Sequence, residues 1–248
     1  MFPMLYYREL LTTDRDAYGI YVQSPFPKEN RRILIGSDVS SRYTRRNRAE
    51  YRKIAGYIAR CVWQRRGNYM VFFPSYRLME DVLQVYEEEF SVDWVRCVCQ
   101  TPDMTEQERE GFLEEFQERE GTLVGFCVLG GIFSEGVDLT GESLIGAVIV
   151  GTGLPQIGSQ REILKEYYDK KNHCGFDYAY RYPGMNKVLQ AAGRVIRTKE
   201  DKGVILLLDD RFWDRDYQEI FPREWQDRTG CRLDTVEGAV ETFWKRFT

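Results

Sequence analysis

The chain has 248 residues, of which 43% are hydrophobic and 30% charged, a composition typical of a globular protein with a substantial core. Its formal net charge of −4 excludes a global basic field, so any contact with nucleic acid must be local. No apolar run approaches the roughly 20 residues of a membrane helix, and the N-terminus lacks a signal-peptide pattern, so we expect a cytoplasmic protein with no membrane partner.

Strands are predicted at 18–22 and 33–36, followed by a helix over 44–66. Five further apolar runs then predict strands at 69–73, 95–99, 123–129, 145–150 and 204–208. Helices are predicted at 75–89, 105–119, 158–170, 184–197 and 236–246, and Thr105 with Glu108 forms a capping box at the start of the second of these. Runs that are apolar on both faces and separated by helices predict a parallel sheet covered on both sides, a three-layer α/β/α domain spanning 1–248.

The six cysteines carry no metal-binding pattern. None forms a C-x-x-C pair, and the one histidine, His173, cannot complete a zinc quartet of the usual spacing. Cys97 and Cys99 alternate along a predicted strand, where buried thiols act as small hydrophobic side chains. We therefore expect structural thiols and no metal site.

Polar residues follow the strands at the carboxyl edge, where parallel sheets bind ligands. Ser75 stands at a helix start, either as an N-cap or beside a phosphate, and the two roles are compatible. The segment 130–144 has the glycine spacing of a P-loop but lacks its Lys and Ser/Thr. Asp209 and Asp210 could mimic a magnesium-binding acidic pair, but without a P-loop a structural role is favoured.

The predicted helix 184–197 has two different faces. Val188, Leu189 and Ala192 belong to the apolar face, whereas Gln190, Arg194 and Arg197 fall on the opposite one. These three form either a solvated polar face or a site for the outer oxygens of a triphosphate, which guanidinium groups bind bidentately. Gly193 favours the second interpretation, because a glycine inside a helix costs about 1 kcal/mol and suggests a close approach.

The segment 41–53 is the densest basic cluster in the chain. Its arginines, interleaved with Tyr43 and Tyr51, could follow a DNA backbone. A charge run at a helix start is more often solvated, and we favour that interpretation for most of the cluster. Tyr43 and Arg46 are the expected exceptions.

Three segments, in order, resemble the motifs of one protein family. YMVFFPSY (69–76), GIFSEGVDLTGE (131–142) and QAAGRVIR (190–197) resemble motifs IV, V and VI of the second motor domain of XPD/DinG-type superfamily-two DNA helicases. The strand and D-x-R-F turn at 203–212, SPF at 24–26 and SRY at 41–43 are also similar to that family. The resemblance spans nearly the whole chain and implies a RecA-like fold.

The resemblance also implies roles for individual residues. Gln190, Arg194 and Arg197 would face the γ-phosphate of ATP, with Arg197 as the arginine finger. Near the nucleotide and its Mg²⁺ it implies Glu135, Gly136 and Asp138, to which the helix pattern adds Gly193. Toward single-stranded DNA it implies Ser75, Tyr76 and Ser134, to which the basic cluster adds Tyr43 and Arg46.

The family's first motor domain is not part of this sequence. The chain contains no Walker loop and no D-E-A-H string, and the iron-sulfur cluster that often accompanies them would belong to that other half. The sequence therefore predicts the C-terminal half of an ATP-dependent DNA helicase, inactive alone and dependent on an N-terminal motor domain in cis or in trans. One alternative is a non-catalytic nucleic-acid-binding or regulatory module with a helicase-like fold. Another is a magnesium phosphohydrolase using Asp138, Asp209 and Asp210, which lacks an obvious base and phosphate cradle.

Overall fold

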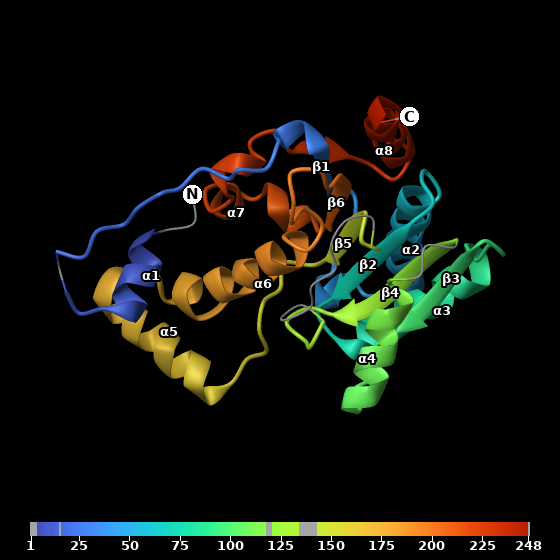
Figure 1. The fold of residues 1–248 in the computed structure, drawn as a ribbon. Helices are drawn as coiled ribbons and strands as arrows, with labels where there is room; N and C mark the ends of the chain where they lie inside the picture. Colours follow the sequence, from blue (N-terminus) through green and yellow to red (C-terminus); the bar gives the residue numbers. More distant parts are fainter. Residues whose placement is uncertain (1–3, 15, 118–120, 134–142, 248) are drawn as a thin grey trace.

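The computed structural model describes residues 4–14, 16–117, 121–133 and 143–247. Within these ranges seven strands form one sheet in the order β3-β4-β2-β5-β6-β1-β7, and every pair is parallel (Figure 1). The strands are β1 (Arg31–Gly36), β2 (Asn68–Phe73), β3 (Val95–Cys99), β4 (Thr122–Val128), β5 (Gly146–Val150), β6 (Gly203–Leu208) and β7 (Thr229–Cys231). The predicted parallel sheet is confirmed.

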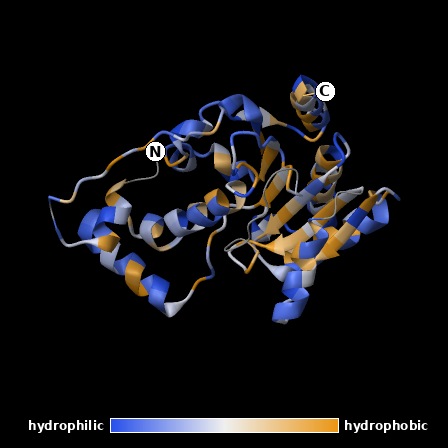
Figure 2. Ribbon diagram, viewed as in Figure 1, coloured by the Kyte–Doolittle hydropathy of each residue, from blue (hydrophilic) through white to orange (hydrophobic). Residues whose placement is uncertain are grey.

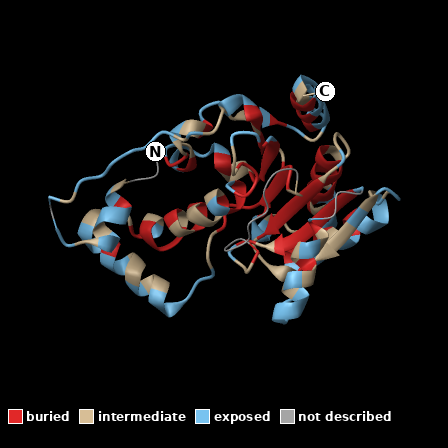
Figure 3. Cartoon of the chain, viewed as in Figure 1, coloured by how far each residue is buried: buried red, intermediate tan, exposed pale blue. Residues whose placement is uncertain are grey.

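The central strands are apolar because both of their faces are covered. Every residue of β2, β5 and β6 is buried, whereas every residue of the edge strand β3 is at least partly exposed. Figures 2 and 3 show the sheet as the most hydrophobic and most buried part of the molecule. Continuous apolar runs are the pattern that two covered faces require.

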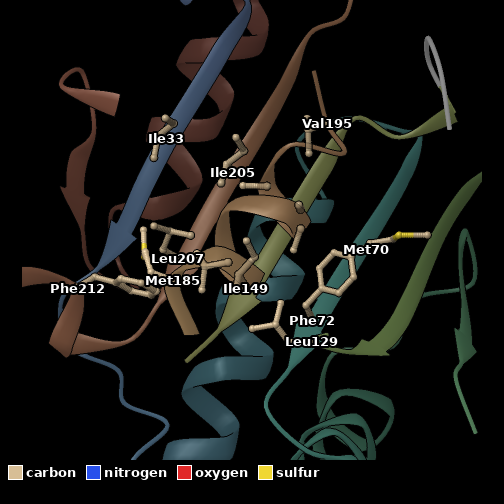
Figure 4. Packing of buried hydrophobic residues seen from close by; sticks show 14 of the residues in the cluster. Ile33, Met70, Phe72, Leu129, Ile149, Met185, Val195, Ile205, Leu207 and Phe212 are labelled. Atoms are coloured by element: carbon tan, nitrogen blue, oxygen red, sulfur yellow. The ribbon is translucent and has the colours of Figure 1, made fainter. Parts of the chain in front are cut away.

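Helices cover the two faces of the sheet. On one face lie α2 (Arg48–Val62), α3 (Tyr76–Glu89) and α8 (Val236–Trp244). On the other lie α4 (Glu106–Glu115) and α6 (Tyr182–Ala192), and Met185 of α6 packs near Ile149 and Leu207 of the sheet (Figure 4). The result is the three-layer α/β/α arrangement expected from the sequence.

A smaller helical group lies beside α6. It consists of α1 (Met4–Leu11), α5 (Ser159–Asn172) and a π-helical turn (Asp177–Arg181). The ring of Tyr6 in α1 lies 5.3 Å from that of Tyr178 and 4.9 Å from that of Tyr182. The remaining short helices are η1 (Lys28–Asn30), η2 (Tyr43–Arg45), η5 (Asp210–Trp213), α7 (Arg215–Gln218), η6 (Arg223–Trp225) and η7 (Lys245–Phe247).

Four predicted elements differ from the structure, and one of them is the helix predicted at 105–119, which ends at Glu115. Residues 18–22 are not a strand: Tyr18 is 96% exposed, and no described strand pairs with the segment, so β-propensity alone did not suffice. Helix α2 begins at Arg48 rather than near residue 44, because Asn47 caps it by accepting a hydrogen bond from the Glu50 amide. Helix α6 ends at Ala192 rather than at 197.

Candidate functional site

The carboxyl ends of three strands meet at one point on the sheet edge. Ser41 follows β1, Pro74 follows β2, and Gly151 follows β5 with φ +84°. A Cβ atom on Gly151 would lie 2.6 Å from Ser41 Oγ and 3.7 Å from Pro74 Cγ, so the three segments are in contact. The predicted gathering of glycines and hydroxyls on one rim is present here.

Asp209, at the end of β6, is fully buried and saturated with hydrogen bonds. Its Oδ2 accepts from Ser41 N (2.9 Å), Ser41 Oγ (2.6 Å) and Arg211 Nη2 (2.9 Å). Its Oδ1 accepts from Arg211 N (3.0 Å) and Nε (2.7 Å). Burial alone would raise the pKa of this carboxyl, but the Arg211 charge and the bonds from Arg211 and Ser41 outweigh it, and the net pKa is lowered. Both oxygens are occupied, so Asp209 has the structural role favoured from the sequence.

The neighbouring Asp210 connects this network to the basic segment. Its carboxylate accepts a hydrogen bond from Ser40 Oγ at 2.9 Å and pairs with Arg42 and Arg45, each at 3.6 Å. An acidic pair so engaged does not offer the open ligand set of a magnesium site. Among the described residues, no group of three or more His, Cys, Asp or Glu side chains could hold a metal ion.

Most arginines of the basic segment are neutralised by carboxylates. Arg48 pairs with Glu88 and Glu89, and Arg52 pairs with Glu89. Arg46 differs, since its guanidinium carbon lies 5.5 Å from the ring centroid of Tyr43, which is 78% exposed. A cation beside an exposed aromatic ring at the sheet rim is the arrangement expected to meet a base and a phosphate together.

At the end of β2, Ser75 caps helix α3. Its hydroxyl accepts a hydrogen bond from the Leu78 amide at 3.4 Å, which is the N-cap role considered from the sequence. Tyr76 follows in the first turn and is partly buried, and its hydroxyl accepts a hydrogen bond from Gln100 Nε2 at 2.9 Å. Gln100 was not among the site residues predicted from the sequence.

The segment 190–197 is a helix end followed by a turn, which corrects the predicted stripe. Gln190 is exposed on the last turn of α6, and Gly193, with φ −66° and ψ −6°, is its C-cap. The amides of Arg194 and Val195 donate to carbonyls three residues back, so the α-helical pattern stops there. Arg194 is only 7% exposed, so Gln190, Arg194 and Arg197 do not share one solvent-facing helical surface.

The predicted reason for Gly193 also changes. Gly193 lies at the helix end rather than inside the helix, and within 4 Å of an added Cβ the nearest atoms are the carbonyl oxygens of Leu189 and Gln190. No other described segment therefore requires glycine at this position. A hollow of about 300 Å³ opens beside it, with Phe26 and Trp225 among its walls.

A buried carboxylate holds the turn that carries Arg197. Asp201 is 5% exposed, and its Oδ2 accepts hydrogen bonds from the amides of Arg197 and Thr198, both at 2.7 Å. Asn30 Nδ2 donates to the Lys199 carbonyl at 2.7 Å and ties the same turn to the start of β1. Asp201 was also missed from the sequence, where it reads as one charge in the polar stretch TKED.

Four predicted site residues fall outside the described part of the chain: Ser134, Glu135, Gly136 and Asp138. The segment leading to them is described. A Cβ on Gly130, which has φ +76°, would lie 2.8 Å from the end of the Lys187 side chain. Helix α6 therefore contacts the base of this segment.

Two further properties bear on the site's chemistry. Burial raises the pKa of Cys97 and of Cys99 to about 11, so neither thiol is an activated nucleophile. None of the helices within the described ranges is long and apolar enough to cross a membrane.

Comparisons with known proteins identify the family. The model of the helicase C-terminal domain matches residues 58–228. A probable ATP-dependent helicase of Methanocaldococcus jannaschii is 29% identical over 79% of this chain and 31% of its own length. The ATP-dependent DNA helicase XPD of Sulfolobus acidocaldarius is 30% identical over 72% of this chain and 31% of its own length.

Solved structures agree on the fold. An XPD helicase structure superposes with a TM-score of 0.64 and 24% identity, covering 81% of this chain and 35% of its own. The chain thus spans about a third of the length of the relatives it matches. It is a RecA-like domain, and it belongs to the helicase C-terminal domain family.

Proposed function

We propose that this chain is the second motor half of an ATP-dependent DNA helicase and that it completes the ATP site of a first motor domain supplied in cis or in trans. Arg197 acts as the arginine finger, Arg194 lies beside it, and Gln190 contributes a neutral amide. The observation that carries the proposal is the turn after α6. Its Arg197 and Thr198 amides are fixed by the buried Asp201 carboxylate, which holds the Arg197 backbone in one conformation. A finger must be positioned in advance to meet the charge of the transferred phosphoryl group.

ATP and Mg²⁺ are bound mainly by the other half. This sequence has no Walker loop, and the hydrogen bonds of Asp209 leave it unsuited to hold a metal. Bound ATP supplies the phosphoryl group, while Gly193 leaves the helix end open to the nucleotide. Glu135, Gly136 and Asp138 are proposed to border the ribose and magnesium.

Single-stranded DNA is proposed to lie along the carboxyl rim. Tyr43 with Arg46 offers a ring and a charge, and Ser75 with Tyr76 forms the start of α3, where free amides favour a phosphate. Ser134 is proposed to extend this track. Because the net charge is negative, the binding of the chain alone should be weak and salt-sensitive.

The proposal is tested by ATP turnover with and without the first motor domain. We expect no steady-state hydrolysis by the pure chain, with or without single-stranded DNA. In the complete two-motor enzyme, Arg197→Ala should lower turnover by roughly 10³ to 10⁵, the range of arginine fingers, and Arg197→Lys should restore little because an ammonium is not a planar fork. Arg215→Ala is the matched control, since Arg215 is 88% exposed and forms a surface ion pair with Glu219.

The outcomes separate the competing functions. Robust DNA-stimulated turnover by the pure chain would contradict the half-site assignment. If Arg197→Ala left turnover of the complete enzyme intact while DNA binding persisted, the chain would instead be a non-catalytic nucleic-acid-binding module.

A further inference from the structure

We propose that Gln100 is a positioning residue for nucleic acid, which sets the Tyr76 ring and the Gly130–Gly131 turn in one fixed arrangement at the sheet rim. The inference rests on the proposed DNA surface, which does not itself include Gln100. Gln100 follows β3 directly and is 3% exposed, so its amide must find protein partners.

The hydrogen bonds of Gln100 have only one consistent orientation. The Val128 amide at the end of β4 can only donate, and it donates to Gln100 Oε1 at 2.9 Å. Nε2 therefore points the other way and donates to the Tyr76 hydroxyl at 2.9 Å. The hydroxyl then directs its own proton toward the Thr101 carbonyl at 3.5 Å. One buried amide thus orients the phenol.

The same amide forms the floor beneath a glycine turn. The Gly131 amide donates to the Val128 carbonyl at 3.1 Å. A Cβ on Gly131 would lie 3.2 Å from Gln100 Nε2 and 3.5 Å from its Oε1, so the turn rests against the amide. Tyr76 and this turn, which leads toward Ser134, are therefore positioned by one side chain.

Backbone hydrogen bonds also join the segments that carry Tyr76 and the Gly130–Gly131 turn. The Leu129 backbone amide donates to the Phe73 carbonyl at 2.8 Å, and the Gln100 backbone amide donates to the Phe126 carbonyl at 2.8 Å. These bonds place the ends of β2, β3 and β4 together. The Tyr76 ring packs against the core on this face of the sheet, and the Gln100 side chain adds a hydrogen bond that orients its hydroxyl.

The test removes the hydrogen bond between Gln100 and Tyr76 by changing each partner in turn. Gln100→Met keeps the length of the side chain and removes the amide, whereas Tyr76→Phe removes only the hydroxyl. Each should weaken binding of a fluorescent oligothymidylate to this chain about five- to tenfold in an anisotropy titration at low salt, within the range that stacking of one base on an aromatic ring accounts for. The double variant should bind no more weakly than Gln100→Met alone, because that substitution already removes the hydrogen bond to the Tyr76 hydroxyl together with the one from the Val128 amide.

Asn68→Leu is the matched control. Asn68 is another buried amide, 5% exposed, which donates to the Phe116 carbonyl at 2.8 Å from the opposite end of β2. It should lower the melting temperature without changing DNA affinity.

Each outcome bears on one of the two proposals. The positioning role is overturned if Gln100→Met binds DNA like the wild type or if Asn68→Leu weakens binding as much as Gln100→Met does. It is also overturned if the losses of affinity caused by Gln100→Met and Tyr76→Phe add in the double variant. Absence of any DNA binding by the wild-type chain would instead refute the proposed DNA surface, and this inference with it.

Discussion

Replacing Asp209 with asparagine should destabilise the domain strongly. The substitution replaces a carboxylate whose two oxygens accept five hydrogen bonds, three of them from Arg211. In either orientation of the new amide, its NH₂ group replaces one of these oxygens and points at hydrogen-bond donors. Breaking a buried ion pair costs about 3–5 kcal/mol, and because the Arg211 side chain is 19% exposed and can recover some water, we expect about 3 kcal/mol.

Thermal unfolding of this chain measures the loss. For a domain of this size, 1 kcal/mol corresponds to roughly 2–4 °C, so the melting temperature should fall by about 10 °C. Asp214→Asn is the control, because Asp214 is 58% exposed and its contact with Arg42 is 3.8 Å long, and it should shift melting by no more than about 2 °C.

The pH dependence of this difference is a second check. The folded pKa of Asp209 is lowered, so the carboxylate contributes stability that is present above its unfolded pKa, about 3.9, and is lost as the pH falls through the folded pKa. The gap between wild type and Asp209→Asn should be constant from pH 7 to about pH 5 and narrow below about pH 4. Melting within 1 °C of the wild type, or a gap that persists in acid, would refute the reasoning.

Three further substitutions test the site. Asp201→Asn should loosen the turn and reduce ATP turnover of the complete enzyme about tenfold, a smaller loss than that of Arg197→Ala. A variant with the melting temperature and the turnover of the wild type would contradict this. Ser75→Ala should cost about 1 kcal/mol of stability through the lost N-cap, seen in urea unfolding, and should also weaken DNA binding. Gly193→Ala should change the melting temperature of this chain little, because alanine fits its φ and ψ but its Cβ would lie 3.2 Å from the Leu189 carbonyl oxygen, and it should lower ATP turnover. Unchanged turnover would remove Gly193 from the nucleotide site.

Much of the fold follows from local patterns, because a strand buried on both faces is a continuous apolar run. β2, β5 and β6 were predicted within a residue or two for this reason. The rim was predictable as well, since parallel strands place their carboxyl ends together. The strand predicted at 18–22 was wrong because a strand also needs a neighbouring strand to pair with, and β-propensity does not indicate whether one is present.

The contacts that organise the candidate site were not predictable from periodicity. Gln100 bonds to groups 24 and 28 positions away in the sequence, and no pattern in one strand identifies those partners. The buried network of Asp209 joins it to Ser41 across 168 positions. The resemblance located the motifs, whereas these bonds show how the motifs are held.

The end of α6 shows why a helical wheel was the wrong geometry for the two arginines. The chain must enter β6 at Gly203, and Val195 occupies the space over that glycine, where an added Cβ would lie 2.1 Å from Val195 Cγ1. A helix continued to residue 197 would carry Val195 away from this position and leave only five residues for the return. The turn instead buries Val195 and brings Arg197 to the Asp201 carboxylate. Packing of the apolar residues between the arginines therefore determines where the arginines lie.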